Sequence, residues 1–258
     1  MSGIEGVRAW THSTFLPVEA QVTTTLAADS WLVVDGRVLA FERHRRRFAD
    51  AVAEAGGDPH EALAASAAAT QLVPPAGRWS PRLDLTPEGI RLRLRPAPEP
   101  SRSVTVTTAQ QDPRSLPLRK GPDLAALGRL QAAESERVGA SIEPIITVDG
   151  LVAESAWSAV LWWRGDALCV PDARIPRLPS VTAAVLRELA RRDAIELQEE
   201  SATPADLDGC EIWLANALRG IRAVSDWVDG PRVAPATRAA DWQRRLEGER
   251  NAASVIPR

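Results

Sequence analysis

Apolar and polar positions in the first third of the chain follow patterns typical of both strands and helices. An apolar stretch is followed by Asp35-Gly36, a pair that favours a tight turn between strands. Phe41, Phe48 and Val52 then recur at helical spacing up to a Gly-Gly pair, which favours a helix end. The pattern predicts helices at residues 41–55 and 59–70 and strands at residues 21–25, 31–34, 79–85 and 90–95.

A proline-rich segment, RPAPEPS at residues 95–101, interrupts this pattern. Proline resists both helix and central strand, so the segment is expected to link two domains. We therefore expect a mixed α/β (α+β) protein, with a small N-terminal α/β domain over residues 1–97 and a larger domain over residues 98–258. Beyond the linker, the pattern predicts strands at residues 104–108, 145–148, 151–154, 160–163, 211–214 and 223–228, and helices at residues 122–138, 181–192 and 237–247.

Composition narrows the class of protein. The 258 residues are 45% hydrophobic and 25% charged, with a net charge of −3, which is typical of a globular protein and argues against a nucleic-acid footprint. The sequence has no apolar run long enough for a membrane span and no secretory signal pattern, so we expect a cytoplasmic protein. Two cysteines and three histidines give no disulfide framework and no evident metal centre.

Lysine is nearly absent from the sequence. Lys120 is the only lysine among 31 basic residues, and there is no tyrosine. A GC-rich genome that encodes arginine in place of lysine explains most of this bias, but it does not explain why one lysine remains. Lysine can form a Schiff base and can lose its proton at neutral pH, whereas arginine can do neither. Lys120 is therefore a candidate for chemistry that requires an amine.

Four short motifs accompany Lys120 along the chain. HRRRF spans residues 44–48, DGLVAE residues 149–154, LPSVTA residues 178–183 and NALRGIRAV residues 216–224. With Lys120, the first three resemble the H-x-x-R, D-G-x-V-x-E and L-P-G-I-T-R motifs of class IV aminotransferases, the fold type IV family of pyridoxal 5'-phosphate (PLP) enzymes. The fourth is similar to the N-S/A-L-x-G-I-x-P-V motif of aminodeoxychorismate lyases. The resemblance implies the two-lobed fold type IV architecture.

The resemblance also implies roles for individual residues. Lys120 would hold PLP as a Schiff base and move protons, and Glu154 would pair with the protonated pyridine nitrogen, which makes these two the expected catalytic residues. Arg47 would bind the cofactor phosphate, and only the motif register selects it among neighbouring arginines. The alternatives to these roles are that Lys120 is a solvated loop lysine, that Glu154 is a surface carboxylate and that Arg47 is a solvated arginine. His44, on the apolar stripe, is expected to be a hydrogen-bonded structural residue.

Two further segments are expected to bind the cofactor phosphate. Ser180, Val181 and Thr182 open a predicted helix, where exposed N–H groups and the helix dipole favour an anion. The resemblance assigns a second phosphate loop to Asn216 and Ala217. An ordinary serine N-cap and an ordinary loop asparagine are the alternatives.

Taken together, the motifs imply a PLP-dependent aminodeoxychorismate lyase of folate synthesis, which releases pyruvate and 4-aminobenzoate from a small substrate with a primary amine and carboxylates. They also imply a homodimer, with Trp162 and Trp163 as interface candidates. Arg219 or Arg222 would meet a substrate carboxylate, unless both lie at the surface. A branched-chain or D-amino-acid transaminase with the same cofactor is one alternative. A PLP-binding paralogue without activity is another, favoured by the missing tyrosine and by Ala159, where the family has asparagine.

Overall fold

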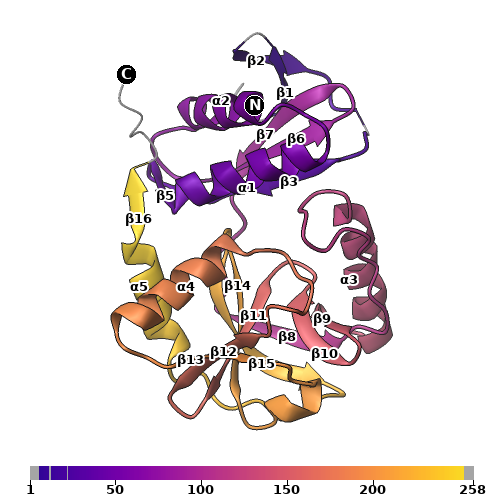
Figure 1. Ribbon diagram of the computed structural model, residues 1–258, viewed down its shortest axis with the longest axis vertical. Coiled ribbons are helices and arrows are strands. Elements are labelled where there is room, and N and C mark those ends of the chain that lie inside the picture. The colour runs from indigo at the N-terminus through magenta and orange to yellow at the C-terminus, as the bar shows by residue number, and fades with distance from the viewer. Residues whose placement is uncertain (1–5, 12, 22, 253–258) are drawn as a thin grey trace. The chain divides into compact units, whose positions relative to one another are not determined.

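The computed structural model describes residues 6–11, 13–21 and 23–252, and the chain divides into two compact units (Figure 1). The N-terminal unit takes the described residues up to Glu99, residues 119–122 and those from Glu249 onward; the C-terminal unit takes residues 100–118 and 123–248. Lys120 therefore belongs to the N-terminal unit, whereas the sequence analysis places it in the C-terminal domain. No helix in the described part of the chain is both long and apolar enough to cross a membrane.

An antiparallel sheet forms the framework of the N-terminal unit. Its strand order is β16-β5-β4-β6-β7-β1-β2, and β3 pairs with β6 beside β4. The strands are β1 (Gly6–Thr11), β2 (Thr14–Val18), β3 (Ala27–Ser30), β4 (Val33–Val34), β5 (Arg37–Leu39), β6 (Arg78–Thr86), β7 (Gly89–Pro96) and β16 (Arg250–Ala252).

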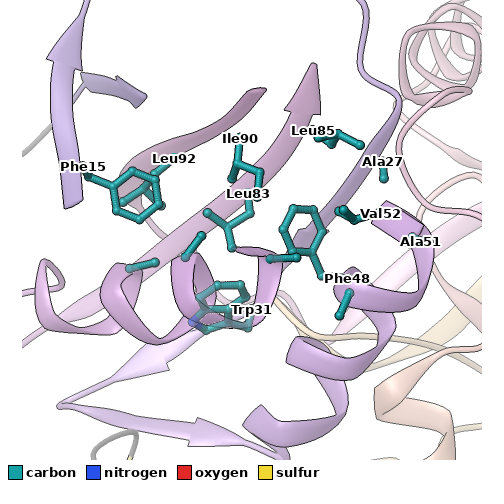
Figure 2. Close-up of a cluster of buried hydrophobic side chains, with 14 of the residues drawn as sticks. Phe15, Ala27, Trp31, Phe48, Ala51, Val52, Leu83, Leu85, Ile90 and Leu92 are labelled. Atoms are coloured by element: carbon teal, nitrogen blue, oxygen red, sulfur yellow. The ribbon is translucent and has the colours of Figure 1, made fainter. Parts of the chain in front are cut away.

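Helices α1 (Phe41–Glu54) and α2 (Pro59–Gln71) supply the rest of the N-terminal core. Phe48 and Val52 of α1 pack with Leu83 of β6 and Leu92 of β7, and all four are fully buried (Figure 2). Because successive strand residues point to opposite faces, the arginines that alternate with these leucines lie on the other face of the sheet. Helical spacing in α1 and alternation in β7 thus determine which face of the sheet is apolar.

The sheet of the C-terminal unit is mixed, in the order β10-β9-β8-β15-β14-β11-β12-β13. Its strands are β8 (Ser103–Thr108), β9 (Glu143–Val148), β10 (Leu151–Ser155), β11 (Ala159–Arg164), β12 (Ala167–Pro171), β13 (Leu197–Glu200), β14 (Glu211–Asn216) and β15 (Gly220–Val228). The helices are α3 (Leu124–Val138), α4 (Val181–Arg192) and α5 (Ala239–Gly248), with a short 3-10 turn at Pro204–Leu207.

Two of these helices connect parallel strands. β8 and β9 are parallel and are joined through α3, and β12 and β13 are parallel and are joined through α4, as parallel neighbours require a crossover. In contrast, β9 and β10 form a hairpin. Asp149 and Gly150 both have positive φ, 50° and 79°, the conformation of a type I′ turn. The hairpin has a bulge between Val152 and Glu154, so the carboxylate lies just beyond an irregularity in the ladder.

Some predictions for the elements are wrong. A strand is expected at residues 21–25, but the described residues 21 and 23–25 are not in a strand. The strand in this part of the chain is instead β3, which begins at Ala27, is buried throughout and contains no β-branched residue. Tertiary packing overrides strand propensity there. The hairpin of β1 and β2 is not predicted at all.

Trp162 and Trp163 are buried within the C-terminal unit, where Trp163 packs against Trp213, so they do not form a surface for a second subunit.

Candidate functional site

A buried aspartate organises the polar residues of the N-terminal unit. Asp29 of β3 is fully buried, and its carboxylate meets two side chains of α1. Arg47 donates from Nε to Oδ2 at 2.7 Å and from Nη2 to Oδ1 at 3.0 Å, and His44 Nδ1 lies 2.8 Å from Oδ1. The Arg47 side chain keeps 15% of its surface exposed. Asp29 therefore fixes the guanidinium that the sequence selects for a phosphate.

The charges of this cluster follow from its burial and its neighbours. Burial raises the pKa of Asp29, but Arg47 and His44 outweigh it and hold the pKa well below its usual range. Burial lowers the pKa of His44, and the charges of Arg47 and Lys120 lower it further, against the opposing effect of Asp29. His44 is buried and serves as a hydrogen-bonding partner of Asp29, as the sequence predicts.

Lys120 is attached to the edge of the same strand. Its carbonyl accepts the Ala28 N–H at 2.6 Å, so the backbone of residue 120 continues the sheet beside β3. Gly121 follows with φ 134°, and a Cβ there would lie 2.7 Å from the Ala27 carbonyl carbon. Only glycine combines this conformation with this close approach. Lys120, Asp29 and Arg47 thus belong to one folded unit, and the half-buried lysine is placed by its backbone.

Glu154 is held between two donors in the C-terminal unit. Arg114 donates from Nη1 to Oε1 at 2.5 Å, and the Leu178 N–H donates to Oε2 at 3.2 Å. Glu154 itself is 8% exposed, so its carboxylate is buried and not a solvated strand end. Sequence reasoning missed Arg114, because it lies forty positions away in a loop without regular structure.

The start of α4 leaves one hydroxyl without a partner. Ser180 is the N-cap, and its Oγ accepts the Ala183 N–H at 3.2 Å. Thr182 is 1% exposed, and its Oγ1 has no hydrogen-bond partner among the described residues. The first-turn N–H groups of Val181 and Thr182 also have no acceptor within the helix. A buried hydroxyl beside such N–H groups is what an anion would satisfy.

The Asn216 side chain stabilises the turn that follows it through hydrogen bonds to the backbone. Its Oδ1 accepts the Leu218 and Arg219 N–H groups at 3.1 and 2.9 Å, and its Nδ2 donates to Ser158 Oγ at 2.9 Å. Arg222 is buried, donates to Ser158 Oγ at 3.0 Å and forms an ion pair with Glu143. Arg222 therefore does not lie at the surface, which is one of the two alternatives, and its contact with a substrate carboxylate stays a prediction.

A second group of charges lies on the polar face of the N-terminal sheet, and we call it the arginine cluster: Arg82, Arg93 and Arg95 around Asp84. Arg82 and Arg93 form ion pairs with opposite oxygens of the buried Asp84, at 2.5 and 3.2 Å. Burial, followed by the charges of Arg82 and Arg93, lowers the pKa of Arg95. Beside Arg95, Ser80 has a fully buried hydroxyl without a partner in the described chain. Three arginines against one carboxylate leave this face positive.

A comparison with models of known protein families identifies the family of this chain. A family model described as amino-transferase class IV matches residues 26–227. The chain belongs to the class IV aminotransferase family. A search of curated proteins found no significant match.

Several solved structures share the fold of this chain. A Mycobacterium tuberculosis hypothetical aminotransferase, bound to α-ketoglutarate and PMP, is 21% identical with a TM-score of 0.76, covering 94% of this chain and 98% of its own. A Thermobaculum terrenum branched-chain aminotransferase in its PLP form is 16% identical with a TM-score of 0.76, covering 94% and 93%. A Legionella pneumophila protein provisionally named a 4-amino-4-deoxychorismate lyase is 16% identical with a TM-score of 0.72, covering 86% and 90%. The predicted fold type IV architecture with its two sheets is confirmed.

Proposed function

We propose that the protein is a PLP-dependent aminodeoxychorismate lyase that releases pyruvate and 4-aminobenzoate in folate synthesis, with the cytoplasm as its compartment. The observation that carries this choice is the arginine cluster. Aminodeoxychorismate bears two carboxylates, and three arginines facing one aspartate suit a dianion. A branched-chain amino acid has one carboxylate and an apolar side chain, which an arginine-rich surface would not favour. A dicarboxylate 2-oxo acid would suit the same arginines, so the cluster supports a dianionic substrate and the assays described below separate the lyase from the transaminase.

The placement of the cluster supports this assignment. Lys120 pairs with Ala28 on β3, and Ala28 is the register partner of Asp84 on β6. Adjacent strands are about 4.8 Å apart, so the Lys120 backbone and Asp84 are separated by roughly 10 Å, two strand spacings. That separation is on the scale of a substrate whose amine and distal carboxylate lie at opposite ends.

The polar groups fit the proposed cofactor. The unpartnered Thr182 hydroxyl and the first-turn amides of α4 suit a phosphate, and the Ser180 N-cap completes that turn. We assign the phosphate to these groups, to Arg47 and to the loop at Asn216 and Ala217. In that loop the Asn216 side chain is already used to shape the backbone.

The remaining roles concern charge and protons. PLP, when bound, supplies an electron sink conjugated with the substrate nitrogen. We assign its covalent attachment to the Lys120 amine, and its ring nitrogen to Glu154. The released Lys120 amine would take the proton from the amine-bearing ring carbon and return a proton as pyruvate leaves. Asp29 would keep Arg47 oriented throughout, because its carboxylate is already paired at two nitrogens.

The experiment compares two assays of the purified chain supplied with PLP. A lyase forms pyruvate and 4-aminobenzoate from aminodeoxychorismate without a 2-oxo acid, and Lys120→Ala should abolish this turnover. Turnover only when an amino acid and a 2-oxo acid are both present would favour the transaminase. Bound PLP without either reaction would favour a non-catalytic paralogue. Borohydride reduction and peptide mapping should place the cofactor on the Lys120 peptide.

We also propose that the protein forms a homodimer, because closed two-fold dimers are the commonest assembly and the family builds its sites in this way. Light scattering at micromolar concentrations tests this independently of activity. A monomer mass with full PLP occupancy would contradict it.

A further inference from the structure

Two Asp-x-Arg segments of the C-terminal unit have the same local geometry. In each, the arginine backbone N–H and Nε bind one aspartate oxygen and Nη2 binds the other: Asp112 with Arg114, and Asp172 with Arg174. The Arg174 side chain is 85% exposed, whereas the Arg114 side chain is only 2% exposed. Arg174 makes the same contacts with its aspartate and remains exposed, so these contacts do not by themselves bury the arginine. The burial of Arg114 therefore has a further cause.

That cause lies in the remaining nitrogen of Arg114. Nη1 donates to Glu154 Oε1 at 2.5 Å and to the Pro176 carbonyl at 3.1 Å. Burying a guanidinium is unfavourable unless hydrogen-bonding partners replace its bound water. In Arg114, Asp112 binds Nε and Nη2, while Glu154 and the Pro176 carbonyl bind Nη1. Burial lowers the pKa of Arg114, but Asp112 and Glu154 outweigh it and raise the pKa, so the group stays charged. Arg114 thus presents a fixed positive charge to Glu154.

We propose that Asp112 and Arg114 form a positioning pair that keeps the Glu154 carboxylate ionised and oriented as the partner of the cofactor ring nitrogen. This inference rests on the role of Glu154 in the proposed function. A carboxylate in contact with a guanidinium is a weaker base than a free one. A proton shared between this carboxylate and a pyridine nitrogen therefore stays on the nitrogen. Without Arg114, the proton would move toward Glu154 and the ring would lose its positive charge.

The first test concerns Glu154 in the full-length chain without cofactor. Carboxyl-labelled glutamate followed by NMR across a pH series reports each titration, and Glu154→Gln assigns the resonance. Arg114→Gln should raise the titration midpoint of Glu154 by about one pH unit or more, since a close opposite charge shifts a carboxyl by about 1–3 units. Arg114→Lys should restore most of the shift. Arg174→Gln, the matched control, should leave Glu154 unchanged.

A second variant covers the case in which Arg114→Gln does not fold. Asp112→Asn keeps the buried arginine but loosens its orientation, so it should shift the Glu154 titration in the same direction by a smaller amount. No shift in either folded variant overturns the proposal.

The second test uses ring-nitrogen-labelled PLP. Its resonance should report a protonated nitrogen in the wild type, Arg114→Lys and Arg174→Gln, and an unprotonated one in Arg114→Gln. A protonated nitrogen in Arg114→Gln overturns the link to the ring. If the wild type binds no PLP, the proposed function fails, whereas the titration of Glu154 still shows whether Arg114 holds its charge.

Discussion

Gly121 lies directly against the backbone of Ala27. A Cβ at Gly121 would be 2.7 Å from the Ala27 carbonyl carbon and 2.8 Å from the Ala28 nitrogen, and all of these neighbours are backbone atoms that cannot rotate away. The same Ala28 nitrogen donates to the Lys120 carbonyl. The position of the lysine therefore depends on the absence of a side chain at the next residue.

Gly121→Ala should destabilise the N-terminal unit by about 1–3 kcal/mol, because it combines an unfavourable φ with overpacking. It should also reduce the fraction of Lys120 that borohydride links to PLP. Urea denaturation and mass spectrometry of the Lys120 peptide measure the two effects. Gly128→Ala is the control: it lies in α3 with open space around it and should stabilise by about 0.5–1 kcal/mol. Equal effects of the two substitutions would contradict the prediction.

Thr182→Val should change stability and cofactor affinity in opposite directions. The substitution removes a buried hydroxyl without a partner, so the cofactor-free protein should gain about 1 kcal/mol of stability. The same change removes a donor assigned to the phosphate, so PLP should bind roughly tenfold more weakly. Thermal unfolding of the cofactor-free protein and equilibrium titration with PLP separate the effects. Unchanged affinity would exclude Thr182 from the phosphate site.

Arg47→Ala should weaken PLP binding, because its guanidinium is oriented by Asp29 and is assigned to the phosphate. It should also destabilise the protein by about 3–5 kcal/mol, because it leaves the buried Asp29 carboxylate without this partner, so the Kd is measured under conditions where the variant is folded. A charge-assisted contact contributes about 1.5–3 kcal/mol, which corresponds to a tenfold or greater rise in Kd. Turnover at saturating PLP should change little. Arg46→Ala, one residue away and exposed, should leave the Kd as in the wild type. A comparable loss in both variants would indicate a general effect of helix charge.

Asp29→Asn should lower stability by about 3–5 kcal/mol near neutral pH, because it removes the partner of the largely buried Arg47. The folded pKa of Asp29 lies below its unfolded value. Its ionised form therefore contributes stability above the unfolded pKa of about 3.9, and this contribution is lost as the pH falls toward the folded value. Urea denaturation of both proteins at several pH values should give a constant difference above pH ~5 that shrinks below pH ~4. A difference that persists at pH ~3 without change would refute this assignment.

Arg93→Gln and Arg95→Gln should each raise the KM for aminodeoxychorismate by about tenfold, because each removes a charged contact to a carboxylate. The kcat and the borohydride trapping at Lys120 should stay near wild-type values. Arg37→Gln, an exposed arginine of β5, is the matched control for net charge. If KM is unaffected, the arginine cluster is not the carboxylate site.

Local patterns account for what the sequence could predict. Phe48 and Val52 define α1 by their spacing, and Asp149-Gly150 defines the hairpin that carries Glu154. Contacts between distant segments account for what it could not. Asp29 stands among alanines and a serine with no pattern of its own, and its partner Arg47 lies eighteen positions away on another element. The role of Arg114 similarly depends on its contact with Glu154, which lies forty positions further along the chain. The one local signal for it was the Asp-x-Arg spacing, which Arg174 shares without any such partner.

The N-terminal sheet has a consequence for how the chain is made. Its β3 edge is completed by residues 119–122 and its β5 edge by β16, which pairs Arg250 with Leu39. β16 follows the C-terminal unit in the chain and is synthesised after it. Until then, the edge of β5 that pairs with β16 has no partner strand in the nascent chain. Open edges recruit strands from other chains. Folding of the unit that contains Arg47 is therefore complete only after β16 has been synthesised, and residues 1–99 expressed alone would retain both of these open edges.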